Sequence, residues 1–102
     1  MSGISKAIIL GRLGSDPELT TTANDITVCN FSVATSKKRK GKEEKTNWHR
    51  CVAFNSAGET IAQYCKKGGK IYIEGDLEYS SYEKDGVTKF STSIEVRNFE
   101  FC

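Results

Sequence analysis

The stretch that decides the fold is residues 46–79, TNWHRCVAFNSAGETIAQYCKKGGKIYIEGDLEY. Its first part, 46–54, reads as a β-strand, in which successive side chains point to opposite faces. Its last part, 70–79, also reads as a strand, because Ile71, Ile73 and Leu77 fall on one face. The segment between them carries helix signals, so the stretch predicts the order strand, helix, strand.

A single helix is predicted between these two strands, over residues 57–67. Ser56 and Glu59 have the spacing of a capping box, which is typical of a helix N-terminus. Two lysines near the end of the segment suit the negative end of the helix dipole, and Gly68 can supply a left-handed C-cap. Behind the cap lies an apolar stripe formed by Ile61, Ala62, Tyr64 and Cys65.

Further strands are predicted on both sides of this stretch, at residues 4–13, 26–35 and 87–101. The first two are separated by a turn at GSDPEL, residues 14–19, where Pro17 breaks a ladder of backbone hydrogen bonds. Three strands, a helix and two strands is the order of the five-stranded OB-fold barrel, an all-β fold with its helix between strands 3 and 4. We therefore expect residues 1–102 to form one OB-fold domain, a size that suits a single core.

Local signals in the second half refine this prediction. Gly75 interrupts the pattern of its strand and indicates a bend or bulge. The connection 80–86, SSYEKDG, ends in Asp85-Gly86, which favours a tight hairpin turn. In the last strand the apolar residues change from one face to the other after Val96, which predicts a bulge near Arg97-Asn98.

The charge of the chain is unevenly distributed. The net charge is only +2, yet residues 37–45, KKRKGKEEK, hold six basic side chains and two acidic ones. Such a run between two strands is a solvated hairpin-like loop. It can also attract a polyanion, and the two interpretations are compatible.

The four cysteines do not indicate a metal site. They form no C-x-x-C pair and have no histidine cluster beside them, because the chain contains one histidine. Cys29 lies in an apolar strand pattern with Phe31 and Val33 on the same face, and Cys51 lies in another strand. Without a secretory signal, we expect reduced thiols and no metal or other cofactor.

Several classes of function are disfavoured. No apolar run approaches the roughly 20 residues that cross a bilayer, so we expect a soluble, cytoplasmic protein that binds no membrane. The sequence has no Gly-x-Ser-x-Gly and no phosphate-loop motif. Some OB folds host nucleases, so catalysis is disfavoured by the residues and not excluded by the fold.

The aromatic residues of the strand 46–54 are the most informative feature. Trp48, Arg50, Val52 and Phe54 share one face of this strand. One interpretation places both rings in the core; the other exposes them, because an arginine on the same face is rarely buried without a partner. Exposed rings beside a basic loop suit single-stranded nucleic acid, whose bases stack on aromatic side chains while Lys and Arg follow the phosphates.

The sequence also resembles the bacterial and phage single-stranded DNA-binding proteins over nearly its whole length. The resemblance rests on LGRLGSDPEL at 10–19, FSVATS at 31–36, NWHRCVAF at 47–54, YCKKGGKIYIEGDL at 64–77 and the closing strand. It implies an OB fold, binding of single-stranded DNA without sequence preference, no enzymatic activity and usually a homotetramer. The roles implied by this family are the coating and protection of single-stranded DNA in replication, recombination or repair.

The resemblance also suggests roles for individual residues. Trp48 and Phe54 match stacking aromatics of the family, Tyr82 falls where many members have tryptophan, and Arg39 falls near another such position. His49 and Tyr72 match positions associated with subunit contacts, although a satisfied, partly buried imidazole explains His49 equally well. The complete predicted DNA-binding set is Trp48, Phe54, Arg50, Tyr82, Tyr79, Lys37, Lys38, Arg39, Lys40 and Arg12.

One departure from the family concerns partner proteins. Typical bacterial members continue into a flexible segment with an acidic tip that recruits replication and repair enzymes, whereas this sequence stops at FEFC. We expect a short, phage-type member or a trimmed DNA-binding domain, without recruitment through such a tip. Two alternatives stay open: a primosome-like OB subunit that binds proteins first and DNA second, and a nuclease-like OB enzyme.

Overall fold

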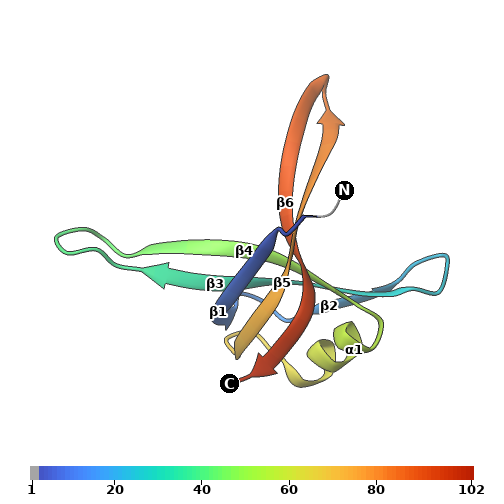
Figure 1. Ribbon diagram of the computed structural model, residues 1–102, viewed down its shortest axis with the longest axis horizontal. Helices are drawn as coiled ribbons and strands as arrows, with labels where there is room; N and C mark the ends of the chain where they lie inside the picture. Colours follow the sequence, from blue (N-terminus) through green and yellow to red (C-terminus); the bar gives the residue numbers. More distant parts are fainter. Residues whose placement is uncertain (1–2) are drawn as a thin grey trace.

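The computed structural model describes residues 3–102 and contains six strands and one helix. Figure 1 shows the strands crossing at the centre of the molecule, with long hairpins extending away from it. In chain order the elements are β1 (Lys6–Leu13), β2 (Glu18–Thr21), β3 (Thr27–Lys37), β4 (Lys45–Phe54), α1 (Asn55–Tyr64), β5 (Lys70–Lys84) and β6 (Val87–Phe101).

Five of the strands form a closed ring of pairings. The order is β1-β5-β6-β4-β3, and β3 returns to β1 through the pairs Arg12–Ala34 and Leu13–Val33. Every pairing in the ring is antiparallel except that of β4 with β6. Helix α1 connects β4 to β5, which are the third and fourth of the five ring strands in chain order. This confirms the predicted all-β class and OB topology.

The prediction missed one strand. Residues 18–21, expected at the end of a turn and beyond it, form β2, which pairs with β3 from Glu18–Asn30 to Thr21–Thr27. All four residues of β2 are exposed, so the strand has no buried face that would mark it in the sequence. It lies outside the ring and leaves the predicted five-stranded order intact.

The helix starts and ends earlier than predicted, at Asn55 and Tyr64 instead of 57 and 67. The expected capping box is wrong: the N-cap is Phe54, which makes no side-chain cap hydrogen bond, and Ser56 lies inside the first turn. Asn55 has a left-handed φ of 55° and turns the chain directly from β4 into the helix. Gly68 also has a positive φ, of 86°, but it belongs to a turn beyond the helix.

The core fills the interior of the ring, and inward-facing residues alternate along its strands. Cys29, Phe31 and Val33 are buried together, as the sequence predicted. Tyr64 is an exception to the predicted helix stripe, because it is 67% exposed and its ring lies beside Phe101. The buried core consists of Leu13, Cys29, Phe31, Val33, Cys51, Ala53, Ile61, Cys65, Ile71, Ile73, Ile94 and Val96.

The cysteines in this core behave as apolar side chains. All four cysteines are free thiols, and only Cys102 is exposed. Burial raises the pKa of the Cys51 thiol to about 12. Burial, and to a smaller extent the neighbouring Cys65, raises the pKa of the Cys29 thiol to about 11. These thiols therefore stay neutral and pack as small hydrophobic groups.

The two predicted irregularities of β5 and β6 are one bulge. Glu74 pairs with Asn98 and Gly75 pairs with Val96, so Arg97 is left without an opposite residue. This confirms both the break at Gly75 and the bulge near Arg97. The strands approach so closely there that a Cβ on Gly75 would lie 2.2 Å from the Glu95 carbonyl oxygen.

Besides the β2–β3 hairpin, at the right of Figure 1, two hairpins extend beyond the ring as long arms. The first arm is the end of β3, the basic loop and the start of β4, and it confirms the hairpin predicted for the basic segment. The second arm is the end of β5 and the start of β6. Its turn is Asp85-Gly86, with φ of 54° and 77°, as predicted. However, residues 80–84 of the expected connection continue β5.

The close approach at Gly75 predicts that Gly75→Ala lowers the free energy of unfolding by about 1–3 kcal/mol, the usual cost of overpacking. The added methyl group meets rigid backbone and forces β5 and β6 apart. Urea denaturation at one protein concentration measures the change. Gly3→Ala is the control, because nothing lies within 4 Å of a Cβ there. Equal unfolding midpoints for the two variants would contradict the bulge geometry.

Candidate nucleic-acid interface

The outward face of β4 carries the predicted aromatic and basic residues. Cys51 and Ala53 are fully buried, whereas Trp48 is 64% exposed and Phe54 is 39% exposed. Arg50, which lies between them, is also exposed. The core interpretation of Trp48 is therefore wrong, and Phe54 is partly covered at the start of the helix.

Trp48 is exposed but held in place from behind. A Cβ built on Gly14 would lie 2.1 Å from Cζ3 of the Trp48 ring, so the ring lies directly against the glycine backbone. Gly14 is itself fixed, because its N–H donates to the carbonyl of Ser32 at 2.9 Å. The edge of the indole at Cζ3 thus abuts the backbone at Gly14, while much of the ring remains open to solvent.

Pairing across the strands brings Arg12 to the same face. Arg12 of β1 lies opposite Ala34 of β3, and Ala34 lies opposite Trp48 of β4. Because neighbouring strands are about 4.8 Å apart, Arg12 and Trp48 are separated by roughly 10 Å across the small Ala34. The Arg12 guanidinium donates to the Gly68 carbonyl at 3.0 Å and is otherwise exposed.

Arg50 lies opposite Ser32, two pairs further along β4 than Trp48. A shallow groove beside it is lined by Asp16 and Glu18 as well as by Asn30 and Ser32. Neither ion pair found among residues 3–102 involves Arg50, so its guanidinium is available to an anion. Arg50 is the one basic residue among those that line this groove, beside the two acidic residues Asp16 and Glu18.

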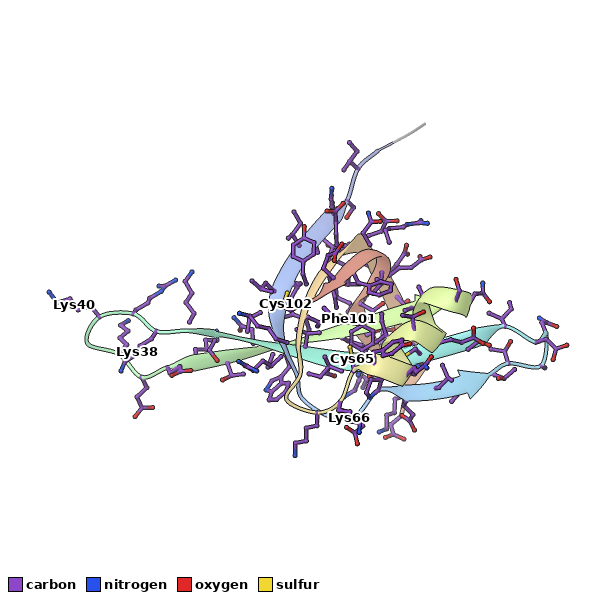
Figure 2. The ribbon with its side chains drawn as sticks, turned by 90° about the horizontal axis from the view of Figure 1, so that it is seen from below. Lys38, Lys40, Cys65, Lys66, Phe101 and Cys102 are labelled. Atoms are coloured by element: carbon purple, nitrogen blue, oxygen red, sulfur yellow. The ribbon has the colours of Figure 1, made fainter. Side chains whose placement is uncertain are left out.

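The predicted basic residues lie along the first arm. Lys37 ends β3, and Lys38, Arg39 and Lys40 follow in the loop, all exposed. Figure 2 shows Lys38 and Lys40 at the far end of this arm, pointing away from the body of the molecule. A groove along the arm is lined by Lys37, Arg39, Lys42, Glu43, Lys45 and Asn47. Positive charge therefore extends outward from the Trp48 face.

The two predicted tyrosines of β5 lie on opposite faces of the second arm. Tyr79 is 70% exposed and lies on the same face as Leu77 and its partner Ile94, which face the core. The arm leaves the ring at this point, so residues on the core-facing side of β5 are exposed to solvent beyond it. Tyr82, 51% exposed, pairs with Lys89 and faces the other way.

Phe90 is an exposed aromatic residue that the sequence reasoning missed. It is 81% exposed and lies opposite Ser81, on the same face as Tyr79. The signal was present in the sequence. The Asp85-Gly86 turn fixes the register of the hairpin, and counting back from it places Phe90 diagonally across from Tyr79.

The two predicted subunit-contact residues lie on different surfaces. His49 is half-buried on the core-side face of β4, and its Nε2 shares a hydrogen bond of 2.8 Å with Thr35. Tyr72 is half-buried on the outward face of β5, and its hydroxyl donates to Glu74 at 3.2 Å. A hydrogen bond from Lys6 holds the pKa of Glu74 below its usual value.

Neither a metal site nor a membrane-spanning helix is found among the residues that the structure describes. Among residues 3–102, no three His, Cys, Asp or Glu side chains gather in a way that could hold a metal ion. Within the same residues, no helix has the length and apolar character needed to cross a membrane.

Fold and surface together define an OB-fold protein with an aromatic, positively charged outward face. The model of the single-strand binding protein family matches residues 4–102, and the chain belongs to this family. It is 42% identical over 103 residues to a single-stranded DNA-binding protein of Xanthomonas campestris, covering 96% of this chain and 60% of that protein. A protein of the same description from Xanthomonas axonopodis is 41% identical, with 96% and 57% covered. The chain thus spans less than two thirds of the length of these relatives.

A solved structure extends the similarity to three dimensions. It is described as a Plasmodium falciparum SSB complex with ssDNA, and it superposes on this chain with a TM-score of 0.90 at 25% sequence identity. The alignment covers 100% of this chain and 97% of the other. The fold is therefore shared from end to end, well beyond the central strands.

The contact between Gly14 and Trp48 predicts that Gly14→Ala displaces the indole ring. A methyl group on Gly14 would occupy the position of the ring, which must move outward into water. Trp48 is the only tryptophan, so its fluorescence reports the change directly. We expect red-shifted emission and stronger quenching by acrylamide than in wild type. Emission identical to that of wild type and of the Gly3→Ala control would contradict the contact.

Proposed function

We propose that this chain binds single-stranded DNA without sequence preference and protects it during replication, recombination or repair. The observation that carries the proposal is the exposed Trp48 ring, held against Gly14, with Arg50 and Phe54 on the same face. Bases of any sequence can stack on such rings, each contributing roughly 1–3 kcal/mol. Membership of the single-strand binding protein family supports the same conclusion.

Electrostatics supplies the second part of the mechanism. The cations of the first arm, Lys37, Lys38, Arg39 and Lys40, follow the phosphates while bases stack on the ring-bearing face. Arg12, in the same cross-strand row as Trp48, and Arg50, two residues along β4, add charge to this face. Binding by stacking and charge needs no catalytic group, so we expect no cleavage of the bound strand. The cytoplasm is the compartment where we expect this activity.

The alternative of a protein-interaction subunit is less favoured by the site. A surface that binds proteins first has no need of a lysine-rich arm beside an exposed indole. Binding of single-stranded DNA does not preclude recruitment of replication or repair proteins. The relatives are longer than this chain, and recruitment can depend on the part that the match does not cover.

Trp48→Ala is expected to weaken binding of poly(dT) by roughly 1–3 kcal/mol, the usual range for one stacked base. The unfolding midpoint should change little, because the ring lies outside the core. Tyr64→Ala is the matched control, since Tyr64 is a similarly exposed aromatic residue at the end of helix α1. Anisotropy titrations with labelled oligonucleotide and thermal melts measure both quantities. Wild-type affinity of Trp48→Ala would refute stacking on Trp48, and a collapse of its melting temperature would place the ring back in the core.

We also propose that the chain assembles with itself, as a homotetramer. The support is an exposed apolar surface on β1, where Ile8 is 59% and Leu10 is 52% exposed. Leu10 lies opposite Tyr72, one of the two residues expected at subunit contacts. Over residues 6–11, β1 pairs only with β5, so its other edge is free to meet a second copy. His49, on a different surface of the chain, would take part in a separate contact.

The assembly proposal predicts a mass near four times the 11.3 kDa of one chain in light scattering. Ile8→Glu should lower this mass, because a carboxylate on the apolar surface cannot be buried between copies. Leu19→Glu, on the exposed β2, is the control and should leave the mass unchanged. A wild-type mass of one chain would refute the assembly, and a dimer would limit it to one type of contact.

A further inference from the structure

The outer part of the second arm is a two-stranded ribbon with both faces open. Strand β1 pairs with β5 only as far as Asp76, and β4 pairs with β6 only at Ile94 and Glu95. Residues 78–93 therefore have no neighbouring strand on either edge. In Figure 1 this ribbon rises away from α1 and from the ends of the other strands. A polymer that meets one face can cross a free edge to reach the other.

One face of this ribbon carries two aromatic rings at diagonal positions. Tyr79 pairs with Thr92 and Phe90 pairs with Ser81, so the two rings are diagonal neighbours across the strands. Side chains in this relation are about 7–8 Å apart. Stacked bases repeat at about 3.4 Å along a strand. The diagonal separation is thus about twice the stacking repeat, which leaves room for one base between the rings.

The exposure of these rings needs an explanation. Phe90, at 81%, is the most exposed aromatic side chain among residues 3–102, and Tyr79, at 70%, is next. Single exposed apolar residues are common, but adjacent ones indicate a binding surface. The rings border a shallow groove of about 430 Å³, whose other walls carry only hydroxyl groups. It is lined by Tyr79, Ser80, Ser81, Phe90, Ser91 and Thr92.

We propose that Phe90 and Tyr79 form a second nucleobase subsite, on the face of the arm opposite Tyr82. This inference rests on the proposed binding of single-stranded DNA and extends it to a surface that the Trp48 face does not include. The rings hold one base between them, and the hydroxyl groups of the groove meet its polar edge. The DNA strand reaches this subsite from the Tyr82 face by crossing the free edge of the ribbon.

The chemistry of the groove favours a base over the other possible occupant, a second copy of the chain. Interfaces between protein copies are depleted of serine, whereas three of the six residues that line the groove are serines. A phosphate would require a cation, and the groove has none. A neutral, flat group with hydrogen-bonding edges fits both rings and hydroxyls.

The test starts with Phe90→Ala, which removes one wall of the subsite. We expect poly(dT) to bind roughly 5- to 100-fold more weakly, the loss expected for one stacked base. The dependence of affinity on salt should not change, because no charge is removed. Thr88→Ala, on the same face nearer the tip, is the control and should bind as wild type. Wild-type affinity of Phe90→Ala would overturn the subsite.

A fluorescent reporter tests the contact directly. In a Trp48→Phe background, Phe90→Trp places the only tryptophan in the subsite, and saturating poly(dT) should quench its emission. Tyr64→Trp in the same background is the control at a distant exposed position and should be quenched much less. Unquenched emission at position 90 would overturn the proposal. So would a Phe90→Ala variant that binds poly(dT) as wild type does while its assembled mass in light scattering changes. If wild-type protein does not bind poly(dT), the proposed function itself fails; if wild type binds and Phe90→Ala binds equally well, this subsite alone is wrong.

Discussion

The structure depends on which side chains of β4 face the core and which face outward. This strand is paired on both edges, with β3 along its whole length and with β6 at Cys51 and Val52. Two paired edges prevent rotation of the strand, and a shift of one residue would exchange its faces. Such a shift would bury Arg50 and the Trp48 ring and expose the small side chains of the core. The buried Cys51 and Ala53 therefore determine where the aromatic surface lies.

The rest of the interface is organised around this strand. Ala34 is small enough to leave the space between Arg12 and Trp48 open, and Gly14 leaves room for the edge of the indole ring. The closed ring of strand pairings that fixes β4 also sets the directions in which the first and second arms leave the body. A rigid centre with a charged arm and an aromatic arm suits a flexible polymer, because the polymer can bend to follow both while the protein stays ordered.

The sequence predicted the features that depend on local patterns and buried faces. The ring strands, the Asp85-Gly86 turn and the bulge at Arg97 are each marked by parity or by turn residues. Strand β2 was missed because none of its residues is buried. The helix start was wrong because the backbone of Asn55, rather than a side-chain cap on Ser56, turns the chain out of β4.

The candidate site was predictable to a similar extent. The exposure of Trp48 followed from the arginine on its face, whereas the support from Gly14 depends on a contact between segments far apart in the chain. The separation of Tyr79 from Tyr82 required knowing that β5 continues past residue 79, where the expected loop would have left their directions undefined. Phe90 gained significance only once the register of the arm was known.

The most direct test of the account is the fluorescence of the single tryptophan during titration with poly(dT). Stacking of a base on Trp48 should quench its emission in proportion to binding, and added salt should release the strand and restore the signal. The same titration with duplex DNA should leave the emission almost unchanged, because duplex bases cannot reach the ring. If poly(dT) binds, as measured by anisotropy, while the Trp48 emission stays constant, the aromatic face of β4 is not where the bases stack.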